Sequence, residues 1–102
     1  MRRLIQAAAA QSMVFDALQG ETFEISMGTS VQTLRVKNLT PGMLYVFLLK
    51  QDNSGGNSLA WGADIRNGTA ADPRPFAVTV QSFIADTGGI LKADLPGTSS
   101  AP

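Results

Sequence analysis

The chain has 102 residues, of which 44% are hydrophobic and only 16% charged, and its 8 lysines and arginines balance its 8 aspartates and glutamates. This length predicts one domain, and a charged fraction below the roughly 25% of an average domain indicates that a partner covers part of the surface. The charges are scattered rather than clustered, and no apolar run is long enough to cross a bilayer, so we expect neither nucleic acid nor membrane as a partner.

The N-terminal segment differs in composition from the rest of the chain. Residues 1–13 are rich in alanine and free of glycine and proline, which favours a helix. A helix this short is marginal in water by itself, so the segment either packs on something or is a mobile arm. The sequence therefore predicts an N-terminal arm or short helix over 1–13, a β domain over 14–95 and a flexible C-terminal tail over 96–102, which has nothing to bury.

From residue 14 onwards, short apolar runs are separated by turn residues, which is the pattern of an all-β domain. Phe23, Ile25 and Met27 alternate with polar residues and predict a strand with one buried and one solvated face. Residues 33–37 alternate in the same way and predict a second strand of this kind. Both patterns are typical of strands that have one face in solvent.

The next segment is apolar on both faces. Thr-Pro-Gly at residues 40–42 predicts a turn, because proline suits its first central position and glycine its second. Residues 43–49 are then continuously apolar, which indicates either a central strand covered on both sides or a strand whose second face meets another subunit. In so small a domain we favour contact with another subunit.

The remaining elements complete an all-β fold. The composition predicts a hairpin turn at 52–57, extended structure at 58–61, a polar connection over 62–75, and strands at 76–84 and 90–93. Six to seven strands in this length predict a small antiparallel β-sandwich or a jelly-roll-like barrel.

The sequence offers little for catalysis. It contains neither histidine nor cysteine, so nucleophilic triads and dyads built on these residues are impossible. A glycosidase would need two facing carboxylates, yet several acidic residues lie in predicted turns, where aspartate bonds its own backbone. Residues 52–57 lack the spaced acids of an EF-hand loop. We therefore expect no enzyme activity, no cofactor and no metal site.

Trp61 is the only tryptophan and follows a glycine-rich turn. It is either a core aromatic that packs on the 45–49 strand or an aromatic that contacts a partner or ligand. We favour a core position for this side chain.

The order of these elements resembles a pattern found in virion proteins of tailed bacteriophages. In that pattern a Leu-Thr-Pro-Gly turn opens a strand that ends in glutamine, and a glycine-containing hairpin leads to a strand that ends in tryptophan. A loop with glycine and proline, a strand rich in valine and phenylalanine, and a final glycine turn follow. The matching positions here are 38–42, Tyr45, 50–52, Gly55, Gly56, 59–62, 67–69, Pro73, Pro75, the strand up to Phe83 and Ile84, and Gly88 and Gly89.

The resemblance covers about residues 21–92 and implies a structural role. Such proteins are tail-fibre or spike domains, or small proteins that decorate the head. The lack of a shaft, heptads or a second domain makes this chain more similar to a capsid decoration or cement protein, located on the virion surface and made in the host cytoplasm. The implied partner is the major capsid protein or another virion protein, and homotrimerisation through the 43–49 strand is the companion hypothesis. The expected contact residues are Arg2, Arg3, Leu4, Ile5, Leu44, Val46, Leu48 and, if it is not a core residue, Trp61.

Two other functions stay open at this point. A tail-fibre or spike module that binds a host-surface receptor or glycan would use loop residues, for which Trp61, Asp64, Arg66 and Asn67 are the candidates. A carbohydrate-processing enzyme that uses two aspartates is the third.

Overall fold

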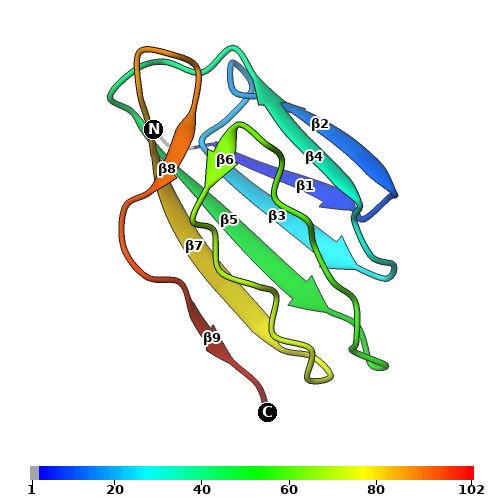
Figure 1. Ribbon diagram of the computed structural model, residues 1–102. Helices are drawn as coiled ribbons and strands as arrows, with labels where there is room; N and C mark the ends of the chain where they lie inside the picture. The colour runs from blue at the N-terminus through cyan, green and yellow to red at the C-terminus, as the bar shows by residue number, and fades with distance from the viewer. Residues whose placement is uncertain (1–2) are drawn as a thin grey trace.

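The computed structural model describes residues 3–102 and is all-β, as the sequence predicts: these residues form strands and no helix. The described residues form nine strands, which are labelled in Figure 1. They are β1 (Leu4–Ala8), β2 (Ser12–Asp16), β3 (Thr22–Met27), β4 (Thr33–Lys37), β5 (Leu44–Gln51), β6 (Ile65–Arg66), β7 (Val78–Ala85), β8 (Leu91–Ala93) and β9 (Thr98–Ser100).

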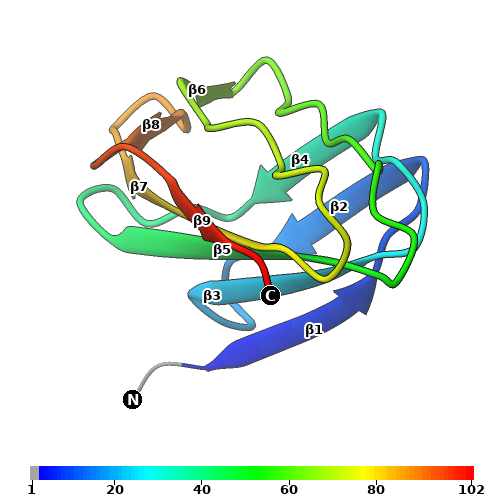
Figure 2. The ribbon, with the colours of Figure 1, turned by 90° about the horizontal axis from the view of Figure 1, so that it is seen from below.

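The strands form two layers. The large sheet has seven strands in the order β1-β3-β5-β7-β8-β6, with β9 beside β7, and the small sheet consists of β2 and β4. The small sheet and the loops between β5 and β7 lie on one side of the large sheet, and no described segment covers its other side (Figure 2). We call this uncovered side the outer side.

The pairing is mixed, whereas the sequence analysis expected antiparallel pairing. β1 pairs with β3 and β3 with β5 in parallel, β2 and β4 are also parallel, and β5 pairs with β7 in antiparallel fashion. The reason is the path of the chain, because β1 to β5 alternate between the two sheets. A chain that crosses to the other layer and returns runs in its original direction, so the strands that meet in one sheet are parallel.

The same alternation changes the interpretation of the glycine-rich turn. Residues 52–57 do not form a β-hairpin, because β5 pairs with β3 and β7 and not with the segment that follows it. Residues 58–61 instead cross to the second layer, where Leu59 forms a bridge with Val31.

Both ends of the chain contribute to the large sheet. Leu4–Ala8 forms β1 rather than a helix, and its Ile5 and Ala7 pack against the core while Leu4 points outward. A short isolated helix is marginal, whereas this strand gains a backbone ladder with β3 and buries apolar surface. In the C-terminal tail, Thr98–Ser100 pairs with β7.

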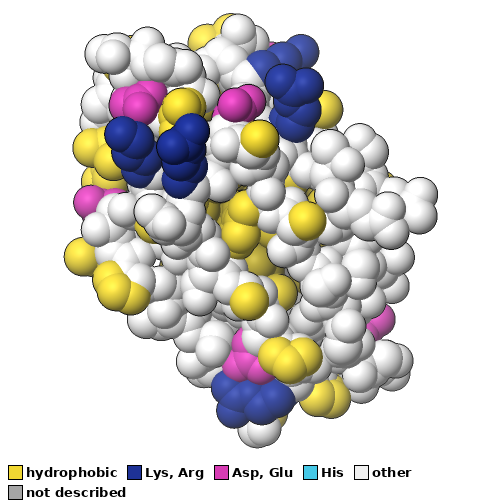
Figure 3. All heavy atoms as spheres, viewed as in Figure 1, with side chains coloured by type: hydrophobic (Ala, Val, Ile, Leu, Met, Phe, Trp, Pro, Cys, Tyr) yellow, Lys and Arg dark blue, Asp and Glu magenta, His cyan; other side chains and the backbone are white. Residues whose placement is uncertain are grey.

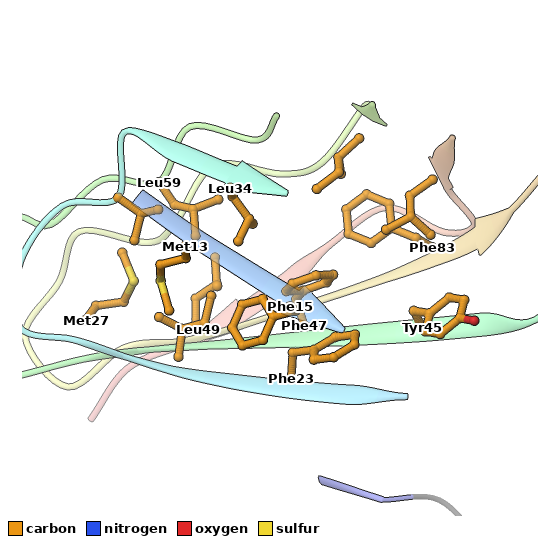
Figure 4. Packing of buried hydrophobic residues seen from close by; sticks show 14 of the residues in the cluster. Met13, Phe15, Phe23, Met27, Leu34, Tyr45, Phe47, Leu49, Leu59 and Phe83 are labelled. Atoms are coloured by element: carbon orange, nitrogen blue, oxygen red, sulfur yellow. The ribbon is translucent and has the colours of Figure 1, made fainter. Parts of the chain in front are cut away.

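The core is a cluster of aromatic side chains between the layers (Figure 4). Phe47 of β5 lies at its centre, with ring centroids 5.0 Å from Phe23, 6.1 Å from Phe15 and 5.7 Å from Phe83. Methionine and leucine side chains continue the core away from Tyr45 (Figure 4). Contacts of this kind stabilise the core beyond area burial alone.

Candidate protein-docking surface

The two central strands of the large sheet carry aliphatic side chains on the outer side. In β5, Tyr45, Phe47 and Leu49 are buried against the core, so the alternate residues point outward. The register places Leu44 beside Ile84, Leu48 beside Val80 and Lys50 beside Val78. We call the resulting surface the apolar outer face; it consists of Leu44, Val46, Leu48, Val78, Val80 and Ile84.

This surface is open and has a polar border. The side chains of Leu44 and Ile84 are 41% and 39% exposed, and the other four members are half-buried by their neighbours. On the β3 side, Glu24 lies beside Leu48 and its carboxylate is 3.5 Å from Lys50 Nζ. An apolar centre with a polar rim is the composition of a protein interface.

Three predicted contact residues, Leu44, Val46 and Leu48, thus lie together on this surface. Leu4 lies on the same side of the sheet, 51% exposed, with Thr22 between it and Val46.

The other predicted contact residues lie elsewhere. Ile5 points into the molecule, and Arg3 is tied locally because its guanidinium donates to Leu18 O and its backbone N–H donates to Glu21. Arg2 lies outside the described residues.

Trp61 is on the opposite side of the large sheet from the apolar outer face. Its ring packs edge-on against Phe47 and Phe83, with centroids 5.3 and 5.0 Å apart, and its Nε1 donates to Thr69 O at 2.8 Å. Gly68 lies flat against the indole, where a Cβ would come within 2.5 Å of the ring. Trp61 is therefore partly buried against the core and holds the 67–69 loop.

Two buried glutamines also hold the loops, and the sequence analysis did not single out their role. Gln51 donates to Asn57 O and Asp72 O and accepts from Asn57, while Gln81 donates to Leu95 O and accepts from Thr69 N. The available signal was the alternation of the strand, which places Gln51 in step with Leu49 and Gln81 in step with Phe83. A glutamine at such an inward position needs several partners for its buried amide.

The loop side carries a groove between residues 33–35 and 62–64. It has a volume of about 370 Å³. In its wall the guanidinium of Arg35, on β4, lies 3.8 Å from the carboxylate of Asp64, and both side chains are exposed. Figure 3 shows this side of the molecule, where cationic and acidic side chains are interspersed around an apolar hollow. Arg66 and Asn67, two other candidates for receptor binding, are exposed and follow Asp64 closely in the sequence.

Three aspartates have lowered pKa values for local reasons. The pKa of Asp72 falls well below its usual range because the side chain and then the backbone of Arg74 donate to its carboxylate. The pKa of Asp16 is lowered chiefly by Asn38, and that of Asp86 by the backbone N–H groups of Ile90 and Gly88. Each carboxylate closes a turn, which is a structural use of the charge.

We expect these carboxylates to make stability fall in acid. Their pKa values are lower in the folded state than the ordinary 3.8, so their contribution is complete above about pH 4 and is lost as the pH falls towards the folded-state values. Urea denaturation at a series of pH values from neutral to strongly acidic measures this loss. The free energy of unfolding of the Asp72→Asn variant should fall less steeply with decreasing pH than that of the wild type. An unchanged dependence on pH would contradict a role for Asp72.

Other kinds of site are not prominent in the described chain. Residues 3–102 contain no group of three or more acidic side chains that could hold a metal ion. The same residues include no helix long and apolar enough to cross a membrane. Comparison with protein-family models, with curated proteins and with solved structures finds no match for this chain. The apolar outer face is therefore the feature from which a function can be argued.

Proposed function

We propose that this protein is a non-enzymatic structural component of a tailed-bacteriophage virion, which binds the capsid surface and stabilises it as a decoration or cement protein. The observation that carries the proposal is the apolar outer face on β5 and β7, which no described part of the chain covers. A monomer in solution rarely leaves its central strands apolar on an open side, so such a surface is typical of a docking site.

The physical mechanism needs only binding. A ligand that binds the assembled lattice, and not its dissociated subunits, stabilises the assembly, and the stabilisation grows with the logarithm of the ligand concentration relative to its Kd. Two aliphatic strands with a charged border suit a flat contact with the capsid, because the border excludes misplaced partners while the centre buries apolar area. The step from docking protein to phage virion rests on the order of sequence elements from 21 to 92, which resembles that of phage virion proteins.

A homotrimer through β5, formed on the capsid and not by the free protein in solution, is part of the same proposal. Since β5 is paired on both sides by β3 and β7, such contacts would use the outward side chains Leu44, Val46 and Leu48 and not the strand's backbone. Trimer formation through these residues would suit a three-fold position of a capsid.

The test is co-sedimentation of the purified protein with expanded, undecorated capsids of the phage that encodes it, followed by heating. We expect saturable binding at a fixed ratio to the major capsid protein and a higher temperature of capsid disruption than for bare capsids. Absence of binding to capsids at saturating protein would reject the cement role.

A second candidate is a fibre or spike module that binds a host receptor or glycan. The groove beside Arg35 and Asp64 favours it, because paired charges in a concave wall can hydrogen-bond sugar hydroxyls. Adsorption of the protein to host cells, lost in an Arg35→Ala variant, together with no binding to capsids, would move the assignment to this class.

A further inference from the structure

The large sheet has a free edge at β1. This strand is the first in the sheet order, and Figure 2 shows no described segment beyond it. An edge strand presents unpaired backbone groups to any chain that can pair with them.

The ladder with β3 determines which groups of β1 are free. Ala9 N donates to Ser26 O at 2.9 Å, and Arg3 O accepts from Thr22 N at 3.3 Å. Because successive residues of a strand direct their backbone groups to opposite edges, the odd-numbered residues face β3. The N–H and C=O groups of Leu4, Gln6 and Ala8 therefore point away from the sheet.

The edge also lacks the features that keep such strands apart. Residues 4–15 contain no charged residue, no proline and no glycine. Natural proteins protect free edges with lysine, proline, bulges or a covering loop. An unprotected, uncharged edge of five residues is suited to strand pairing.

We propose that β1 pairs in antiparallel fashion with β1 of a second copy, with Gln6 on the two-fold axis, so that the two large sheets become one. In this register Gln6 of one copy lies opposite Gln6 of the other, and Leu4 lies opposite Ala8 of the other copy. The outward backbone groups then exchange about six N–H···O bonds, two for each facing pair.

The side chains fit this register on both sides of the sheet. On the outer side, Leu4, 51% exposed in one chain, is placed beside the small Ala8 of the second copy, and the two Gln6 amides can bond each other. On the inner side, Ile5 comes beside Ala7 of the second copy and the two cores meet. No charge lies in the facing rows, so the pairing carries no repulsion.

A second copy fits this edge better through β1 than through β9. The edge at β9 consists of three exposed polar residues, Thr98–Ser100, and would supply no apolar contact to Leu4 or Ile5. The pairing of β1 with β1 of a second copy also forms a closed dimer, because each copy uses the same edge and none is left free for a third copy. It leaves the apolar outer face free on both copies, so it stands independently of the proposed function. One short strand buries little surface, and small interfaces are typically weak. The dimer should therefore form only at high protein concentration.

The test is sedimentation equilibrium of the full chain, the Gln6→Glu variant, the Gln6→Lys variant and an equimolar mixture of the two variants, over a range of high concentrations. We expect the wild type to reach twice the mass of the chain. Each variant alone should weaken dimerisation by at least about tenfold, since two like charges then face each other at the axis. The mixture should recover the dimer, because position 6 then pairs opposite charges.

The matched control is the same pair of changes at Gln19, in the exposed turn after β2, which should leave dimerisation unchanged. A wild type that stays monomeric at all concentrations, or forms trimers, overturns the proposal. A dimer that the Gln6 variants do not weaken, or that their mixture does not restore, overturns it as well. Circular dichroism of each variant checks that the β fold is kept.

Discussion

Replacing Trp61 by alanine is expected to lower the free energy of unfolding by about 3 kcal/mol, at the lower end for buried aromatic residues because the indole is partly exposed. The loss combines the edge-on contacts with Phe47 and Phe83 and the hydrogen bond to Thr69 O. Domains of this size are stable by only about 5 to 15 kcal/mol, so the change removes a large share of the total. Urea denaturation followed by circular dichroism measures it.

The Trp61→Phe variant is the control for this prediction. Phenylalanine keeps most of the aromatic packing and loses the Nε1 donor, so we expect a cost of about 1 kcal/mol from the bond to Thr69 and further loss from the smaller ring. A Trp61→Ala protein as stable as the wild type would contradict the core position of this side chain, and would return Trp61 to the candidates for partner contact.

Replacing Val46 by glutamate is expected to weaken the proposed capsid binding by at least about tenfold, because a carboxylate in the centre of an apolar contact must be desolvated without a partner. Val46 lies between Thr22 and Ser82 on neighbouring strands, so neither of its cross-strand neighbours is charged. Free in solution the new carboxylate can reach water, so the free energy of unfolding should change by no more than about 1 kcal/mol. Co-sedimentation with capsids, beside urea denaturation, measures both quantities.

The matched control is Val14→Glu, the same substitution on an exposed strand position. Val14 is on β2 of the small sheet and is 61% exposed, on the opposite side of the molecule from the apolar outer face. Its binding should stay within about twofold of the wild type. Equal weakening by both substitutions would indicate a general effect of charge, and weakening by Val14→Glu alone would place the contact on the small sheet.

Much of the candidate surface could be predicted from the sequence because it depends on a local property. The continuous apolar run at 43–49 indicated a strand without a solvated face, and Leu44, Val46 and Leu48 lie on the apolar outer face. Its second half, on β7, was harder to recognise because Val78, Val80 and Ile84 join β5 only through pairing between distant segments. Arg3 and Ile5 were expected in contacts as part of an N-terminal docking arm, and the fold uses both locally.

The sequence by itself determined the all-β class, the approximate positions of the main strands and the turn at Pro41 and Gly42, where the glycine has a φ of 84°. These features follow from side-chain alternation and local backbone preferences, which act over a few residues. Only the tertiary structure decided that the first five strands alternate between two sheets, that Leu4–Ala8 is an edge strand and not a helix, and that Trp61 packs against the core. The physical reason is that strand partners are chosen by contacts between segments far apart in the chain, where the free energy of burying a shared core outweighs the weak local preferences of alanine and glycine.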